Sequence, residues 1–116
     1  PIMAGNIFLD IIAGRIPCNK VYEDDEVFAF RDINPQAPTH ILILPKKPIA
    51  TLNDLRPEDA ALVGKLFLVA KQLADDEGLA ERGYRTVFNC NADAGQTVFQ
   101  IHLHLLGGRE LGWPPG

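Results

Sequence analysis

The sequence predicts an α+β fold: about five antiparallel strands in a meander sheet, one short N-terminal helix and one long helix. Hydrophobic residues recur at helical spacing in two segments and in strand-like patterns in five others. The connections between the strands are short enough for antiparallel pairing. A length of 116 residues and a hydrophobic content of 47 % are typical of one globular domain, which we place at residues 1–116.

The N-terminal part is expected to form a short helix followed by a hairpin. Asn6 is of a type that caps helices and Gly14 of a type that ends them, so a helix is predicted over residues 7–13. Two strands are predicted at residues 21–23 and 27–31, joined by an acidic turn. The apolar stripe of the helix fits either a plain core contact or the wall of a binding pocket; it consists of Ile7, Phe8, Ile11 and Ile12.

The middle of the chain is expected to supply a buried strand and a long helix. Residues 40–44 form a nearly continuous apolar run, which is typical of a central strand. Pro57 suits the first turn of a helix, and Gly78 suits the position just beyond its last turn. The apolar stripe of this helix consists of Leu62, Leu66, Val69, Ala70 and Leu73. Two more strands are predicted at residues 84–89 and 98–106.

The last predicted strand carries two of the three histidines. Successive strand side chains point to opposite faces, so Gln100, His102 and His104 share one face, about 6.6 Å apart along the strand. The other face is apolar enough for a core and consists of Ile101, Leu103 and Leu105. Histidines in this pattern can supply a base, a nucleophile or a metal ligand, or can simply be half-exposed. His40, at the start of the buried strand, is either a core-edge residue or a third member of the cluster.

Composition and charge limit the classes of function. A net charge of −4 argues against general binding of nucleic acid or anionic membranes, so a phosphate group would have to be held by local donors. The loop at residues 89–97 is rich in small and amide residues and can turn backbone N–H groups towards an anion. Cys18 and Cys90 show no metal-binding or disulfide spacing. With no recognisable signal peptide and no apolar run of about 20 residues, we expect a cytoplasmic protein.

The stretch Gly-Gln-Thr-Val-Phe-Gln-Ile-His-Leu-His-Leu-Leu-Gly-Gly-Arg, residues 95–109, resembles the signature of the histidine triad proteins. Their Hint-type branch, which consists of nucleotide-binding phosphoramidases, is the most similar. Further matches occur in the same order along the chain, at residues 30–33, 35–40 and 113–116, so the resemblance covers nearly the whole sequence. The first triad position departs from the pattern, because it holds Gln100 and not histidine.

The resemblance implies a purine nucleoside phosphoramidase that needs no cofactor and acts as a homodimer. His102 would attack the α-phosphorus and form a nucleotidyl-histidine intermediate, and the main-chain carbonyl of Gln100 would orient it. His104 would contact the phosphoryl oxygens or the leaving group, with His40 supporting the cluster. The substrate-binding residues that the resemblance implies are Ile7, Phe8, Ile11, Phe30, Asp32, Ile33, Asn89, Gln96, Thr97, Val98 and Trp113. Spacing alone would make Asp32 the start of a turn, whereas the resemblance assigns it to the ribose hydroxyls.

Two alternatives remain open at this level. One is a metallohydrolase in which His40, His102 and His104 hold a zinc ion and water takes the fourth position. The other is a purine-nucleotide-binding module whose turnover is weakened by Gln100. The sequence does not determine the leaving group or the choice between adenine and guanine.

Overall fold

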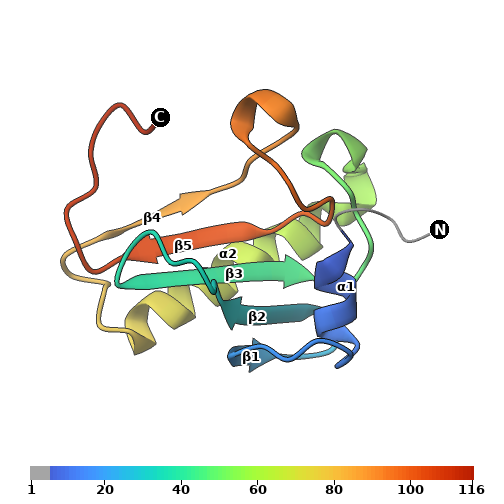
Figure 1. Ribbon diagram of the computed structural model, residues 1–116, viewed down its shortest axis with the longest axis horizontal. Helices are drawn as coiled ribbons and strands as arrows, with labels where there is room; N and C mark the ends of the chain where they lie inside the picture. The colour runs from blue at the N-terminus through green and yellow to red at the C-terminus, as the bar shows by residue number, and fades with distance from the viewer. Residues whose placement is uncertain (1–5) are drawn as a thin grey trace.

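The computed structural model describes residues 6–116 and shows a five-stranded antiparallel sheet with one long and one short helix (Figure 1). The α+β prediction is therefore confirmed. The elements in chain order are α1 (Ile7–Ile12), β1 (Lys20–Glu23), β2 (Val27–Arg31), β3 (Thr39–Pro45), α2 (Ala60–Asp76), β4 (Tyr84–Val87) and β5 (Leu103–Gly107). Three short 3-10 helices lie at Leu52–Asp54, Pro57–Asp59 and Ala92–Ala94.

The order of the strands departs from a simple meander. In the sheet the order is β1-β2-β3-β5-β4, so the last strand lies between β3 and β4. Both β3 and β4 pair antiparallel with β5 and are therefore parallel to each other. Parallel strands need a long crossover connection, and α2 supplies it. The predicted hairpin is confirmed, with β1 and β2 paired antiparallel.

The main core lies between α2 and the sheet face that α2 covers, which is the far face in Figure 1. Alternation along the strands sends every second side chain to this face. The strands contribute Val27, Ala29, Ile41, Ile43, Leu103 and Leu105, and the helix contributes Leu66, Val69, Ala70, Leu73 and Ala74. Four residues of the predicted helical stripe lie in this core, whereas the fifth, Leu62, is only partly buried and lies outside the cluster. Within residues 6–116, no helix has both the length and the apolar composition that a membrane span requires.

The opposite face of the sheet carries a second, smaller cluster under α1. Phe8 and Ile11 of α1 pack there against side chains of β2 and β3, namely Phe28, Phe30, Leu42 and Leu44. The register places Leu42 opposite His104, so His104, the histidine within β5, lies on this same face. This short helix therefore covers only part of the face and leaves room beside it for the histidines.

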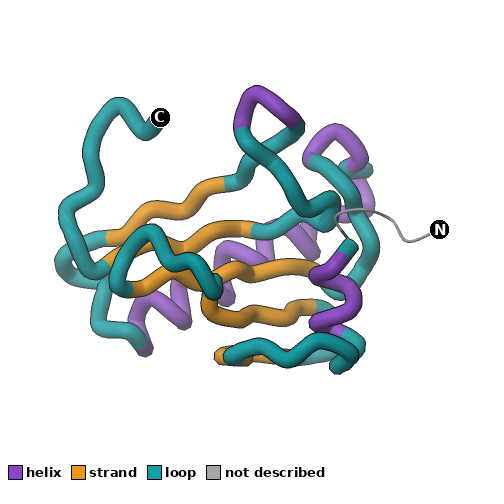
Figure 2. The backbone as a smooth tube through the Cα atoms, viewed as in Figure 1, coloured by secondary structure: helices purple, strands orange, loops and turns teal. Residues whose placement is uncertain are grey.

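The last strand, predicted at residues 98–106, begins later in the structure than expected. Regular pairing begins at Leu103, and residues 98–102 are irregular. On one side β4 ends at Val87, opposite His104. On the other side the N–H of Ile101 donates to the Ile49 carbonyl, so the chain before Leu103 is held by the turn after β3 and not by strand pairing. Figure 2 shows that the chain between β4 and β5 runs outside the sheet as a loop with one short helical turn.

The predicted element ends are mostly close to those observed. Asn6 occupies the N-cap position of α1, but its side chain makes no capping hydrogen bond; its backbone oxygen accepts from the N–H of Leu9 at 3.1 Å. The helix expected from Pro57 begins with a 3-10 turn, and Gly78 follows its end with a φ of +74°, as predicted. The strand expected at residues 84–89 ends at Val87.

The core on the α2 face predicts a large stability loss for Leu66→Ala. Leu66 is completely buried, so the shortened side chain should leave a cavity and lower the free energy of unfolding by about 2–5 kcal/mol. Urea denaturation at one protein concentration measures this change. The control is Glu81→Ala, an exposed position in the turn after α2, which should change stability by less than about 0.5 kcal/mol. Equal midpoints for the two variants would contradict this account of the core.

Candidate active site

A cavity of about 330 Å³ opens on the sheet face that carries the histidines. Its apolar wall comes from α1, the following turn and the strands β2 and β3, and it is formed by Ile7, Phe8, Ile11, Ile16, Pro17, Cys18, Phe30, Ile33 and Leu42. Its polar side consists of Asp32, Asn89, Gly95, Gln96, Thr97, Val98, His102 and His104. Twelve predicted site residues, from segments far apart in the sequence, thus meet around one space.

Three predicted site residues do not line this cavity. His40 is buried behind His104. The side chain of Gln100 is 0 % exposed and does not share the cavity wall with His102 as alternation along a strand predicted, because residues 98–102 are not a strand. Trp113 is 81 % exposed, and its ring lies 5.9 Å from the guanidinium of Arg85 on β4, away from the cavity of its own chain.

The apolar part of the cavity is shaped by aromatic contacts. The ring of Phe8 meets that of Phe30 edge-on, with centroids 5.4 Å apart, and meets that of His102 edge-on at 4.9 Å. Such edge-to-face pairs fix the ring orientations and add to the stabilisation that burial provides. The contact with Phe8 therefore restrains the orientation of the His102 ring at the cavity wall.

The loop before the histidines forms the polar rim. Gly95 adopts a left-handed conformation, with a φ of +82°, and closes the 3-10 turn. The buried amide of Gln96 accepts from Asn91 N–H at 2.8 Å and donates to the carbonyls of Ala50 at 2.8 Å and Val98 at 3.1 Å. Both of its N–H donors are thus used inside the protein, so Gln96 shapes the rim and has no free donor for a ligand.

A single hydrogen bond fixes the position of the proton on His102. Its Nδ1 lies 2.7 Å from the carbonyl oxygen of Gln100. A carbonyl can only accept, so Nδ1 carries the proton and Nε2 of the neutral ring keeps its lone pair. Among residues 6–116, no group is hydrogen-bonded to that Nε2. His102 therefore presents an unprotonated nitrogen at the cavity wall.

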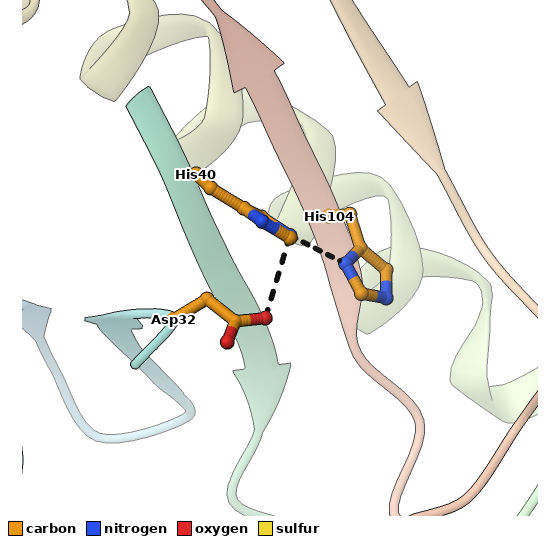
Figure 3. A group of neighbouring side chains, drawn as sticks. All are labelled: Asp32, His40 and His104. Carbon is orange, nitrogen blue, oxygen red and sulfur yellow. Dashed lines mark hydrogen bonds and ion pairs between the residues drawn. The ribbon is translucent and has the colours of Figure 1, made fainter. Parts of the chain in front are cut away.

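A second chain of hydrogen bonds fixes the proton on His104 (Figure 3). The backbone N–H of Gln36 donates to His40 Nδ1 at 3.0 Å, so the neutral His40 ring carries its proton on Nε2. That Nε2 lies 2.9 Å from His104 Nδ1 and 3.5 Å from a carboxylate oxygen of Asp32. His104 Nδ1 is consequently the acceptor, and its proton lies on Nε2. The rings of His102 and His104 are 4.9 Å apart, one with a lone pair on Nε2 and one with an N–H.

Burial keeps all three rings neutral near pH 7. It lowers the pKa of His102 below the ordinary value of 6.5, and the bond to the Gln100 carbonyl opposes only part of this effect. Burial, reinforced by the repulsion of His102 and His40 when charged, lowers the pKa of His104 to about 4. Burial also lowers the pKa of His40, although the nearby Asp32 carboxylate acts in the opposite direction.

The predicted zinc ligand set is not the one that the fold assembles. In the described part of the chain the ligand-like atoms that cluster within 4.8 Å belong to Asp32, His40 and His104, and His102 lies outside that cluster. A metal on His40 Nε2 would move the ring proton to Nδ1. There it would face the N–H of Gln36 at 3.0 Å, donor against donor. The hydrogen-bond pattern therefore fits imidazole chemistry better than metal ligation.

Several residues of the site were not identified from the sequence. Arg109 donates from Nε at 3.2 Å and from Nη2 at 2.9 Å to the carbonyl of Gln36, the residue whose N–H sets the position of the His40 proton. These two residues are 73 positions apart, and no local pattern connects them. Leu42 could have been found, because it lies two positions after His40 on the same strand face.

Comparison with known proteins identifies the family of this chain. Residues 13–111 match the profile of the HIT domain. An uncharacterized HIT-like protein of Synechococcus elongatus is 56 % identical over 110 residues, which are 95 % of this chain and 96 % of that protein. A purine nucleoside phosphoramidase of Escherichia coli is 54 % identical over 106 residues, which are 91 % of this chain and 89 % of that enzyme.

Solved structures give the same result. A HIT family hydrolase from Legionella pneumophila matches with a TM-score of 0.93 and 56 % identity, covering 95 % of this chain and 98 % of that one. A histidine triad protein from Clostridium difficile matches with a TM-score of 0.90 and 40 % identity, covering 97 % of both chains. The resemblance found in the sequence is thus confirmed at the level of the family, and the chain belongs to the HIT, or histidine triad, superfamily.

Proposed function

We propose that this protein is a nucleotide hydrolase that cleaves purine nucleoside phosphoramidates, or related conjugates, to the nucleoside monophosphate. The observation that carries the proposal is the pair of fixed ring protons: an unprotonated Nε2 on His102 beside a protonated Nε2 on His104, at one cavity wall. The first suits attack on phosphorus, and the second suits donation to the charge that the attack creates. The Escherichia coli relative named purine nucleoside phosphoramidase supports the substrate class.

The reaction would proceed in two displacements. His102 Nε2 attacks the α-phosphorus, a nitrogen–phosphorus bond forms, and the bond to the leaving group breaks. His104 donates its Nε2–H as a hydrogen bond to a phosphoryl oxygen or the leaving group; a neutral imidazole N–H is a good donor but a very weak acid. The departing amine takes a proton from water. A second water then attacks the phosphorus, loses its proton to solvent and releases His102.

The nucleoside would lie along the apolar wall. The carboxylate of Asp32 accepts the backbone N–H of Asn34 at 2.9 Å through Oδ1, which holds it in place. Its Oδ2 lies 3.5 Å from His40 Nε2 and keeps a further lone pair for a ribose hydroxyl. Phe8, Phe30 and the exposed Ile33 would contact the base, and Asn89, Thr97 and Val98 the phosphate. The base therefore meets mainly apolar surface, which favours a flat ring system over a particular pattern of base edges.

The alternative of a binding module without turnover rested on Gln100. With glutamine at this position, the group that contacts His102 is the main-chain carbonyl, whose oxygen lies 2.7 Å from His102 Nδ1. This observation favours turnover over simple binding.

Replacing His102 tests the central claim. We expect His102→Ala to lower kcat for adenosine phosphoramidate by about 10³-fold or more, because the attacking atom is lost, while AMP binding persists. Mass spectrometry of the wild type during turnover should show a nucleotidyl adduct that is missing in the variant. The exposed-site variant Glu81→Ala serves as the control for handling and should keep full activity. Undiminished turnover in His102→Ala would rule out the proposed nucleophile.

The pH dependence follows from the lowered pKa of His102. The attack needs the neutral ring, and burial holds its pKa below 6.5, so the neutral form persists to lower pH than in a free histidine. We expect the midpoint of the acid limb of kcat/KM to lie below pH 6.5, the ordinary pKa of histidine. A profile whose acid limb is centred above pH 6.5 would contradict a buried, neutral nucleophile.

We further propose that the protein is a homodimer joined through β4. This strand is at the edge of the sheet, and an unpaired edge favours pairing with another strand. Beside it lies an apolar surface: Leu68 is 68 % exposed, and Phe67, 44 % exposed, packs edge-on against Phe88 at 6.0 Å. The tail is anchored to the same strand, since Arg85 donates to the Gly112 carbonyl at 2.9 Å. Trp113 would then contact substrate only across the dimer.

A charge on this apolar surface should dissociate the dimer. We expect light scattering of the wild type at micromolar concentration to give twice the chain mass of 12.8 kDa, and Leu68→Asp to give the single chain mass. The matched control is Asn19→Asp, which adds the same charge in an exposed position beside the opposite edge strand β1. A wild type that stays at 12.8 kDa would contradict the proposal.

A further inference from the structure

The side chain of Gln100 is one of the largest that are completely buried, and its amide joins two distant segments. Its Nε2 donates to the carbonyls of Pro45 at 2.9 Å and Lys47 at 2.8 Å. Its Oε1 accepts from the backbone N–H of Ile49 at 3.1 Å. Three hydrogen bonds thus tie this one side chain to the turn that follows β3.

An amide matches this set of partners better than other side chains do. The two carbonyls need two donors, and the N–H of Ile49 needs an acceptor. A neutral imidazole offers one donor and one acceptor, a carboxylate offers acceptors only, and a thioether offers no donor. Any of these in place of Gln100 leaves at least one backbone group without its partner, and a buried unpaired group costs free energy.

These bonds lie directly beside the carbonyl that orients His102. The next residue, Ile101, donates its N–H to the Ile49 carbonyl at 2.8 Å, so the turn holds the chain on both sides of the Gln100 carbonyl. No strand pairing fixes the direction of this carbonyl, because β5 begins only at Leu103. The side-chain amide and the Ile101 N–H together supply the restraint that strand neighbours provide elsewhere.

We infer that Gln100 is a positioning residue whose side-chain amide holds its own carbonyl where it fixes His102 in the Nδ1–H tautomer. The glutamine at the first triad position is then a structural clamp that acts on the nucleophile through one carbonyl. The effect on turnover rests on the proposed function, whereas the effect on the tautomer is independent of it.

Two variants test the clamp. Gln100→Met keeps the length and removes all three hydrogen bonds, whereas Gln100→His can keep one carbonyl bond and the bond to Ile49. Nitrogen-15 NMR of the three histidine rings reports which ring nitrogen carries the proton. We expect His102 of the wild type and of Gln100→His to be protonated on Nδ1 near pH 7.5, and Gln100→Met to show a mixture of both tautomers.

Turnover and binding give the second readout. We expect Gln100→Met to lose about 100-fold in kcat, the scale of a misplaced reacting group, with a nearly unchanged Kd for AMP. Gln100→His should stay within about 10-fold of the wild type in kcat/KM. A general loss of stability would lower the folded fraction but would not change the tautomer within it.

The outcomes separate the two proposals. A folded Gln100→Met with His102 wholly in the Nδ1–H form and full kcat would overturn the clamp. If Gln100→Met fails to fold, Gln100→His decides, and a mixture of tautomers there would overturn the clamp because two of its three bonds should suffice. A tautomer shift in Gln100→Met without turnover in any protein would support the clamp and reject the phosphoramidase function.

Discussion

Two backbone groups determine which nitrogen of each histidine ring in this site carries the proton. The Gln100 carbonyl can only accept, and the Gln36 N–H can only donate, so each assigns the proton of the ring beside it. Through His40, the second assignment passes on to His104. As a result, His102 Nε2 has a lone pair and His104 Nε2 carries a proton. Without these backbone groups, the two imidazole rings would have no fixed difference in tautomer.

The rest of the fold keeps these assignments valid. Strands β3 and β5 pair side by side under α2. This pairing places His40 Nε2 2.9 Å from His104 Nδ1. Burial then lowers the pKa of each ring, so the neutral forms on which the tautomers depend prevail at physiological pH. A charged ring would carry protons on both nitrogens, and the distinction would vanish.

The groups that surround the rings act mostly as supports. Gln96 and Gln100 direct their amides to backbone groups of residues 45–50, and Arg109 directs its guanidinium to the carbonyl of Gln36. Each of these groups is hydrogen-bonded to the backbone and holds a neighbouring segment in place. In the proposed function, the substrate would contact the apolar wall, Asp32 and the rim of the loop.

The sequence by itself determined the elements and the pairing of His102 with His104, because the periodicity of hydrophobic residues records which side chains face a core. It could not determine where β5 begins, since that depends on the end of β4 and on the turn after β3, which are distant in the chain. For the same reason the burial of Gln100, the exposed Trp113 and the Gln36–Arg109 contact were decided by the tertiary structure. Local patterns encode the face a residue occupies, whereas hydrogen bonds across 51 or 64 positions exist only once the sheet has formed.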